Sequence, residues 1–309
     1  MENNNSSNPL VSVVVLTYNS SATVLETLDS IKNQTYKNIE LIITDDSSSD
    51  DTVSLCNKWL EANGERFVQV KIVTSEKNSG ISANANRGCF ASQGEWIKII
   101  AGDDRLLPNC ISDNVSFIQK HKNAEIVFSK LRLFGNTIIP KKWICKDVGP
   151  FFRGLTQRQL AIILYRGNFL PASSAWIKYS CLQKLGGYDE QFRLLEDWPF
   201  WMKAVSNGVK LWFLDKETVD YRFSENSVSN SESSESLLDS DTEKGIQLAN
   251  EYIQQMGFGA WLFNKTKTLK AQHSWGYLLY AVNFINPFYY EYRKSGNLFA
   301  EIRKEVVEE

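Results

Sequence analysis

Histidine is nearly absent from this chain of 309 residues, and cysteine is scarce and scattered. His121 and His273 have no plausible catalytic partner nearby in sequence, so His-rich zinc sites and Ser-His-Asp hydrolysis are disfavoured. The five cysteines include no Cys-x-x-Cys pair, which disfavours a disulfide framework, a zinc ribbon and a thioredoxin-like redox site. Any chemistry is therefore expected to rely on carboxylates, and the cysteines are expected to fill the core.

Glycine-rich phosphate loops are missing as well. No Gly-x-Gly-x-x-Gly follows the first predicted strand, and Gly-x-x-x-x-Gly-Lys-Ser/Thr does not occur. A dinucleotide-binding Rossmann site and a P-loop NTPase are both disfavoured for this reason.

The chain also lacks an excess of positive charge and a long apolar run. Its 34 Lys and Arg stand against 36 Asp and Glu, so the net charge of −2 gives no electrostatic footprint of a dedicated nucleic-acid binder. No 18 consecutive residues are apolar, and residues 1–8 lack the basic and apolar regions of a signal peptide. We expect residues 1–8 to be a disordered tail and the protein to be cytoplasmic.

The first half of the chain alternates between short apolar runs and apolar residues at helical spacing. Short apolar runs predict strands at 11–16, 39–43, 67–73 and 96–100, and the first, rich in β-branched residues, is of the kind that is buried on both faces. The helical spacing predicts helices near 24–31, 53–60, 82–91 and 108–118. Such an alternation predicts an α/β fold with a mostly parallel sheet.

The second half is less regular. Its patterns predict four strands, at 124–134, 172–178, 209–214 and 218–222, and helices at 157–165 and 196–204. Residues 224–241 are rich in Ser and acidic residues and poor in apolar ones, so we expect a mobile loop there. Residues 245–309 are predicted to be helical and are rich in aromatic residues.

Three polar clusters follow predicted strands, where parallel sheets bind their ligands. They are residues 17–19, 45–47 and 102–104. In the last cluster, Asp103 and Asp104 are suited to hold one divalent cation, with positions left for substrate phosphates. Such a cation neutralises the charge of a diphosphate leaving group. The same pair also fits a solvated turn that caps the next helix, and the pair alone does not decide between the two.

Two further acidic clusters allow two interpretations each. Asp46 fits turn and helix-cap chemistry, but its carboxylate also suits the imide N–H of uracil or thymine, and Tyr18 suits stacking on the same base. Glu196 and Asp197 precede a helix and fit pairing with its dipole. They also fit a general base in a partly apolar wall, to which Trp198 contributes, because desolvation raises carboxylate basicity.

In combination, these motifs resemble those of the family-2 glycosyltransferases of the GT-A fold, and are similar to those of bacterial surface polysaccharide assembly. The resemblance covers residues 9 to 229 and rests on several ordered segments: 11–19, 30–36, 40–50, 78–80, 94–104, 196–198 and 221–222. It implies a GT-A catalytic domain at 9–230, with a nucleotide-binding half at 9–120 and an acceptor half at 121–230. Residues 231–309 would be a mobile loop and a helical C-terminal extension.

The resemblance also implies an inverting transfer of sugar from a nucleoside-diphosphate-sugar, with Mn²⁺ or Mg²⁺. Position by position, Leu16, Tyr18 and Asp46 would line the nucleobase pocket and favour UDP or dTDP. Asp103 would approach the ribose, and Asp104 would ligate the metal. Asp197 would be the base, with Glu196 beside it.

Three positions depart from the family pattern. Ala101 replaces a frequent Asp, Ala85 replaces a frequent Arg, and Ser224 replaces the His of a Tyr-Arg-x-His segment. The last two changes affect how the protein holds the diphosphate, and Arg87 or Arg222 is expected to compensate. These departures favour one alternative function, a catalytically weak nucleotide-sugar-binding module. A nucleotidyltransferase is a second alternative, although residues 17–20 lack its basic glycine-rich loop.

The acceptor is expected to be a saccharide or a lipid-linked saccharide. Residues 275–290 carry Trp and Tyr close to Arg293 and Lys294, a pattern that suits a membrane interface. The alternative is a helix packed on the catalytic domain with the same aromatics hidden. The first interpretation predicts peripheral contact with the inner face of the cell membrane.

Overall fold

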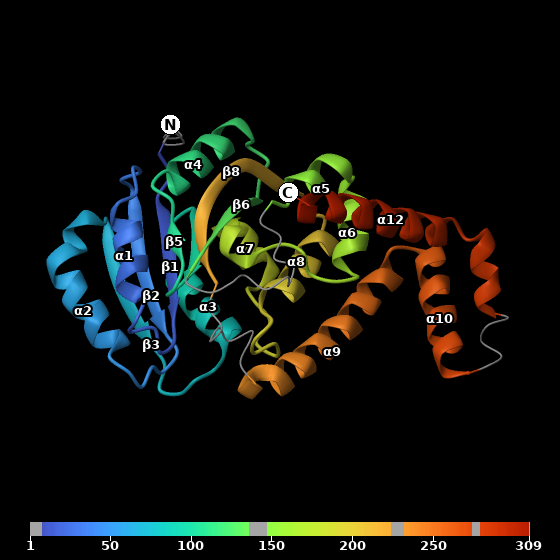
Figure 1. The fold of residues 1–309 in the computed structure, drawn as a ribbon, viewed down its shortest axis with the longest axis horizontal. Helices are drawn as coiled ribbons and strands as arrows, with labels where there is room; N and C mark the ends of the chain where they lie inside the picture. The colour runs from blue at the N-terminus through green and yellow to red at the C-terminus, as the bar shows by residue number, and fades with distance from the viewer. Residues whose placement is uncertain (1–7, 136–146, 224–231, 274–278, 309) are drawn as a thin grey trace.

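The computed structural model describes residues 8–135, 147–223, 232–273 and 279–308 (Figure 1). Within them, eight strands form one sheet in the order β3-β2-β1-β4-β7-β6-β8-β5. The first half contributes β1 (Val11–Thr17), β2 (Ile39–Asp45), β3 (Gln69–Thr74) and β4 (Trp96–Ala101), which pair in parallel. The alternating pattern thus gives the parallel half-sheet that it predicts.

Helices cover both faces of this half-sheet. They are α1 (Val24–Lys32), α2 (Thr52–Asn63), α3 (Ile81–Phe90) and α4 (Cys110–Lys120), with the short 3₁₀ helix η1 (Gly64–Arg66) before β3. Successive side chains of a strand point to opposite faces, so Val14 and Ile42 belong to one core cluster, and Val13 and Leu41 to the other. This explains why the strands read as continuous apolar runs.

The second half makes the sheet mixed. β7 (Trp176–Lys178) is antiparallel to both β4 and β6 (Ile126–Phe134), β6 is parallel to β8 (Leu211–Arg222), and β5 (Arg105–Leu106) is antiparallel to β8. The strands predicted at 209–214 and 218–222 are one continuous strand. The pairing of β8 with β6 skips from Leu214 to Glu217, so the polar residues between them form an irregularity in the strand and not its end.

The helices of this half pack against the mixed part of the sheet. They are α5 (Gly149–Gly154), α6 (Gln157–Leu164), α7 (Tyr179–Leu185) and α8 (Asp197–Ser206), and the 3₁₀ helix η2 (Ala172–Ser174) precedes β7. Four cysteines of the chain are buried free thiols, as expected, and Cys145 lies outside the described residues.

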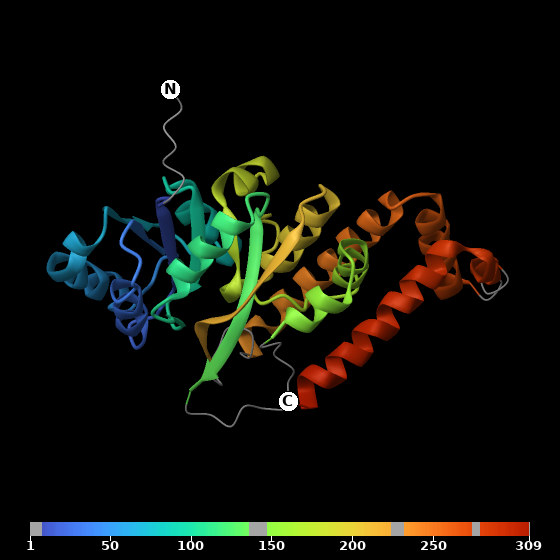
Figure 2. The same cartoon turned by 90° about the horizontal axis from the view of Figure 1, so that it is seen from above.

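The C-terminal extension is helical and leads away from the sheet and back (Figures 1 and 2). It consists of α9 (Glu232–Gln255), α10 (Phe258–Gln272), the 3₁₀ helix η4 (Ala281–Ile285) and α12 (Pro287–Glu308). The returning helix α12 packs on α5, where the rings of Phe299 and Phe151 stack at 4.8 Å. None of the described helices is both long and apolar enough to cross a membrane.

The prediction of a mobile loop at 224–241 is wrong for residues 232–241, because helix α9 begins at Glu232. Residues 224–231 lie outside the described residues. Tertiary contacts outweigh the Ser-rich composition, since Asp241 accepts a 2.8 Å hydrogen bond from the backbone of Leu194, and Ala249 and Ile253 are buried in the core. The extension is thereby attached to the loop that leads into α8.

Candidate active site

The polar clusters that follow β1, β2 and β4 lie at one edge of the sheet. These three strands pair in parallel, and backbone hydrogen bonds continue the alignment beyond them. Asp46 N donates to Thr17 O at 3.0 Å, and Gly102 N donates to Leu16 O at 2.8 Å. The sequence clusters therefore converge as predicted, at the edge where parallel sheets bind ligands.

Asp46 is a buried anchor at this edge. Its carboxylate accepts hydrogen bonds from Ser79 Oγ at 2.6 Å and from Gly80 N at 2.8 Å, and Arg87 lies 3.4 Å away. Gly80 has a φ of +94°, and a Cβ there would lie 2.7 Å from Arg193 O, so the turn requires glycine. The carboxylate thus fixes the turn at 78–80, and a nucleobase would have to share its oxygens.

Tyr18 is the open aromatic side chain of the same edge. Its side chain is 47% exposed, whereas Leu16 is half-buried against the core. The backbone next to Tyr18 is held by Asn19, whose φ is +50° and whose N–H donates to Ser48 Oγ at 2.8 Å. An exposed ring on a fixed backbone is suited to stacking on a base.

Asp103 and Asp104 follow β4 and are largely withdrawn from water. Asp104 is 2% exposed, and its Oδ1 accepts a 2.7 Å hydrogen bond from Arg222 N. Burial raises the pKa of Asp104 well above its usual range, and the neighbouring charge of Asp103 raises it further. Burial also raises the pKa of Asp103. Two desolvated neighbouring carboxylates favour a positive partner over solvent.

Arg222 holds the acidic turn from the side of β8. Its Nε donates to Asp103 O at 2.8 Å, and its Nη2 lies 2.7 Å from Glu26 Oε2. The guanidinium also lies 4.5 Å from the centroid of the Phe134 ring, within the range of a cation–π contact. Arg222 is thus placed next to the predicted metal ligand, but its donors already have protein partners.

Glu196 and Asp197 stand at the start of α8. Asp197 accepts hydrogen bonds from its neighbour Trp198 N at 2.6 Å and from Asn168 Nδ2 at 2.7 Å. Burial raises the pKa of Asp197 to about 6, and these hydrogen bonds act in the opposite direction. Burial and the charge of Asp197 raise the pKa of Glu196 to about 8. Burial and mutual repulsion favour a single negative charge on the pair, and the hydrogen bonds from Asn168 and Trp198 favour that charge on Asp197.

Tyr221 connects the two acidic pairs. Its pKa is raised to about 12, first by burial and then by the negative charges of Asp104, Asp103, Asp197 and Glu196. Both acidic pairs therefore lie within electrostatic range of this one side chain, although more than 90 residues separate them in sequence.

Trp198, expected in the partly apolar wall around the base, lies in the core and is almost fully covered. Its side chain is 5% exposed, and the indole N–H donates to Leu164 O at 2.6 Å. Trp201, on the same helix, is 1% exposed. Both rings pack beneath the acidic pair and contribute to its desolvation, because α8 carries apolar residues around most of its circumference.

The positions that depart from the family pattern lie in different structural environments. Ala85 is fully buried in the core on α3, so the position has no open face for a diphosphate contact. Arg87, one half-turn further on, donates to Asn84 Oδ1 and to Ser79 Oγ, both at 2.8 Å, and reaches the site edge beside Asp46. Ser224 lies outside the described residues.

Sequence reasoning missed Asn168 as a site residue. It lies between α6 and η2, in a stretch with no catalytic motif, and only the fold brings its side chain to Asp197. The one signal in the sequence is the pair Gly167-Asn168, which marks a turn and not a site.

The donor set fits a divalent cation only in part. Among the described residues, no three His, Cys, Asp or Glu side chains form a group that could hold a metal ion. Asp104 offers Oδ2, to which no described side chain or backbone group donates a hydrogen bond, and its desolvation favours a cation. A single carboxylate of this kind suits a magnesium-like ion whose other ligands are water and substrate phosphates.

A sequence model of glycosyl transferase family 2 matches residues 12–185, which is more than half of the chain. The chain belongs to glycosyltransferase family 2. The match includes the strands and turns that carry Tyr18, Asp46, Asp103 and Asp104, and it ends before Asp197. The enzyme class and the GT-A fold expected from the sequence motifs are therefore confirmed.

One curated relative is the UDP-Glc:alpha-D-GlcNAc-diphosphoundecaprenol beta-1,3-glucosyltransferase WfaP from Escherichia coli. This chain is 29% identical to WfaP over 241 residues, which cover 77% of this chain and 86% of WfaP. The aligned length includes most of the catalytic domain.

Solved structures show the same fold. Staphylococcus aureus TarS 1-349 in complex with UDP-GlcNAc has a TM-score of 0.60 at 19% identity, covering 96% of this chain and 90% of that one. A longer TarS chain is spanned to 55% of its length. The mannosyltransferase PcManGT from Pyrobaculum calidifontis, in complex with GDP-Man and Mn²⁺, has a TM-score of 0.54 at 15% identity, covering 93% of this chain and 86% of that one.

Proposed function

We propose that this glycosyltransferase moves one sugar from a nucleoside-diphosphate-sugar to an acceptor hydroxyl with inversion of the anomeric centre. The observations that carry the proposal are the convergence of the turns after β1, β2 and β4 at one sheet edge and the two acidic pairs, in which Asp104 is held by Arg222 N and Asp197 by Asn168. One pair follows β4 beside the nucleotide-binding half, and the other begins α8 in the acceptor half. A single displacement needs these two functions, charge neutralisation on the leaving diphosphate and a base for the incoming hydroxyl.

The donor side consists of Leu16, Tyr18, Asp46, Asp103 and Asp104. Tyr18 stacks on the base, and Asp46 favours a pyrimidine imide, so UDP and dTDP are the preferred carriers. Asp103 approaches the ribose. Asp104 holds Mn²⁺ or Mg²⁺, which supplies positive charge to the diphosphate when it is bound. Support for a divalent metal comes from the fold neighbour whose complex contains Mn²⁺.

On the acceptor side, Asp197 takes the proton of the attacking hydroxyl while the new C–O bond forms. Its Oδ1 and Oδ2 are oriented by Trp198 N and Asn168 Nδ2. Burial and the charge of Asp197 raise the pKa of Glu196, which disfavours a second negative charge beside the base. The division of roles follows from the two hydrogen bonds that Asp197 accepts.

The acceptor is proposed to be a saccharide carried on a lipid diphosphate, and the reaction a step of surface polysaccharide assembly at the inner face of the cell membrane. Support comes from the name of the relative WfaP, which specifies a GlcNAc-diphosphoundecaprenol acceptor.

The deciding experiment offers the purified protein UDP-, dTDP- and GDP-sugars with Mn²⁺ or Mg²⁺, and a GlcNAc-diphosphate-lipid as acceptor. The expected product contains one added sugar in the β configuration from an α-linked donor, identified by NMR. Retention of configuration would refute the single displacement. Nucleotide binding without transfer would favour a catalytically weak binding module, and diphosphate release from a nucleoside triphosphate with a sugar phosphate would favour a nucleotidyltransferase.

A further inference from the structure

The far end of the C-terminal extension exposes a group of large apolar side chains. Ile285 is 86% exposed, Phe258 75% and Phe284 61%. Further exposed members of the group are Trp261, Leu279, Val282 and Tyr290. We call these seven residues the apolar tip. It is located where α10 begins and η4 leads into α12, remote from the sheet (Figures 1 and 2).

The two halves of the apolar tip form one surface. Asn286 Nδ2 donates to Gly259 O at 2.7 Å and joins the start of α10 to the end of η4. On the α10 side, the rings of Phe258 and Trp261 stack at 5.7 Å. The residues on both sides of this contact therefore lie next to one another, although about 25 residues separate them in sequence.

A layer of packed aromatic rings lies beneath the apolar tip, so the side chains of the tip point to the surface. Phe263 contacts Tyr292 at 4.8 Å and Phe288 at 5.9 Å between ring centroids. Phe288 is 5% and Tyr289 8% exposed, so these two aromatics are hidden on the protein side. Within residues 279–290, the exposed and the buried aromatic side chains are therefore different ones, and residues 274–278 lie outside the described residues.

The charge of this region is opposite to that of the rest of the chain. Residues 257–301 contain five Lys or Arg and two Glu, while the remaining residues contain 29 Lys or Arg and 34 Asp or Glu. Of the two acids, Glu291 is paired with Arg158 of α6 at 2.6 Å. At the tip, apolar exposure therefore coincides with a local cationic excess.

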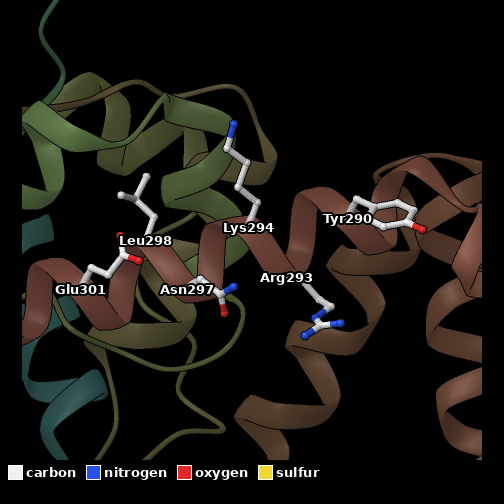
Figure 3. Close-up of a pocket in the computed structure, with 6 residues that line it drawn as sticks. All are labelled: Tyr290, Arg293, Lys294, Asn297, Leu298 and Glu301. Carbon is white, nitrogen blue, oxygen red and sulfur yellow. The ribbon is translucent and has the colours of Figure 1, made fainter.

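A cationic groove continues the apolar tip along α12 (Figure 3). It has a volume of about 390 Å³ and is lined by Tyr290, Arg293, Lys294, Asn297, Leu298 and Glu301. Tyr290 belongs to both surfaces. Its hydroxyl donates to Phe284 O at 2.5 Å, so it places the groove beside the most exposed aromatic residues.

We propose that the apolar tip and the adjoining cationic groove dock the enzyme on an anionic lipid bilayer. Apolar side chains enter the interface between headgroups and acyl chains, while Arg293 and Lys294 meet the phosphates of the headgroups. A second copy of this chain is a weaker candidate, because two cationic surfaces would repel one another. The inference rests on the proposed function for its purpose, since a lipid-linked acceptor is reached from a bilayer surface.

The test measures co-flotation of the full chain with vesicles of phosphatidylcholine alone or mixed with phosphatidylglycerol. We expect binding to the anionic vesicles that salt weakens. Ile285→Ser and Phe258→Ser are expected to reduce the bound-to-free ratio about tenfold each, the scale of one large apolar side chain withdrawn from lipid. Arg293→Gln with Lys294→Gln should remove the preference for anionic vesicles.

Matched controls are Val68→Ser for Ile285→Ser and Phe90→Ser for Phe258→Ser, because Val68 and Phe90 are exposed apolar residues remote from the tip. The controls should bind vesicles as the unmodified chain does. Equal losses in the tip and control variants, or no vesicle binding at all, would overturn the proposal. A dimer in sedimentation that Ile285→Ser dissociates, without vesicle binding, would assign the tip to self-association.

A soluble acceptor analogue separates this inference from the proposed function. The tip variants should transfer sugar to it at the unmodified rate, because none of the substituted residues belongs to the active site. Vesicle binding without transfer in the unmodified chain would refute the proposed function and leave the docking surface standing. Transfer to the analogue without vesicle binding would refute the docking surface and support the proposed function.

Discussion

Asn168 Nδ2 donates a 2.7 Å hydrogen bond to Oδ2 of Asp197, and this contact distinguishes Asp197 from the adjacent Glu196. It stabilises the ionised form of Asp197 and opposes the effect of burial on its pKa. The neighbouring acid has no side-chain donor among the causes that set its pKa, and its pKa is higher. The structure therefore favours Asp197 over Glu196 as the carboxylate that accepts a proton.

The first prediction concerns the base itself. Asp197→Asn should lower kcat about 10²–10⁴-fold, the usual contribution of a positioned general base. Donor affinity should stay near that of the unmodified enzyme, because the base contacts the acceptor. The measurement is a steady-state assay with calorimetric titration of the nucleotide.

Glu196→Gln is the matched variant for the base and should be milder, since burial raises the pKa of Glu196 and no side-chain hydrogen bond opposes that rise. If Glu196→Gln loses activity while Asp197→Asn keeps it, the two roles are exchanged. Full activity in both variants would mean that the acidic pair only caps α8.

The second prediction concerns Asn168 and has a defined sign. The hydrogen bond from Asn168 lowers the pKa of Asp197, so Asn168→Ala should raise it from about 6. A base must be deprotonated, so kcat/KM rises as pH rises through that pKa, and the acidic limb of the profile should move to higher pH in the variant. At pH well above the limb, the loss should shrink to that caused by misorientation alone.

A pH–rate profile of kcat/KM checks this prediction, with Asn207→Ala on the C-terminal end of α8 as the control substitution. Asn207 donates to Lys203 O, away from the acidic pair. An unshifted acidic limb in the Asn168→Ala profile would show that Asn168 contributes to packing and does not set the pKa of Asp197.

The third prediction concerns Asp104. Asp104→Asn retains a side-chain oxygen for the hydrogen bond from Arg222 N but removes the charge. We expect Mn²⁺-dependent binding of UDP to be lost in calorimetry, while the melting temperature without metal stays equal or rises, because a buried carboxylate with a raised pKa is costly to ionise. Unchanged Mn²⁺-dependent affinity would remove Asp104 from the metal site.

The fourth prediction separates two roles of Asp46. If its carboxylate also contacts the base, Asp46→Asn should weaken UDP and dTDP more than GDP. If it acts only as the anchor of Ser79 and Gly80, all three nucleotides should weaken together and the melting temperature should fall. Tyr18→Ala is the companion variant, and it should weaken nucleotide binding without destabilising the fold, since the ring is half exposed. Tighter binding of GDP than of UDP to the unmodified chain would contradict the pyrimidine preference.

The parallel half of the fold and its acidic edge follow from local sequence pattern. The run at residues 11–16 is apolar at five of its six positions, a pattern typical of a strand covered on two faces. The acidic residues that follow β2 and β4 lie at the ends of such strands, so their convergence follows from the alternation of strand and helix. Local pattern sufficed there because each element buries its own apolar face in a regular layer.

Tertiary structure alone decided the acceptor side and the extension. Asn168 meets Asp197, Trp198 lies under the acidic pair, and Ile285 is exposed while Phe288 is buried, although nothing in local composition separates these residues. Helix α9 forms through a Ser-rich stretch because contacts such as that of Asp241 with Leu194 N outweigh weak local propensity. These outcomes depend on which distant segments meet, and the free energy of such contacts is absent from any short window of sequence.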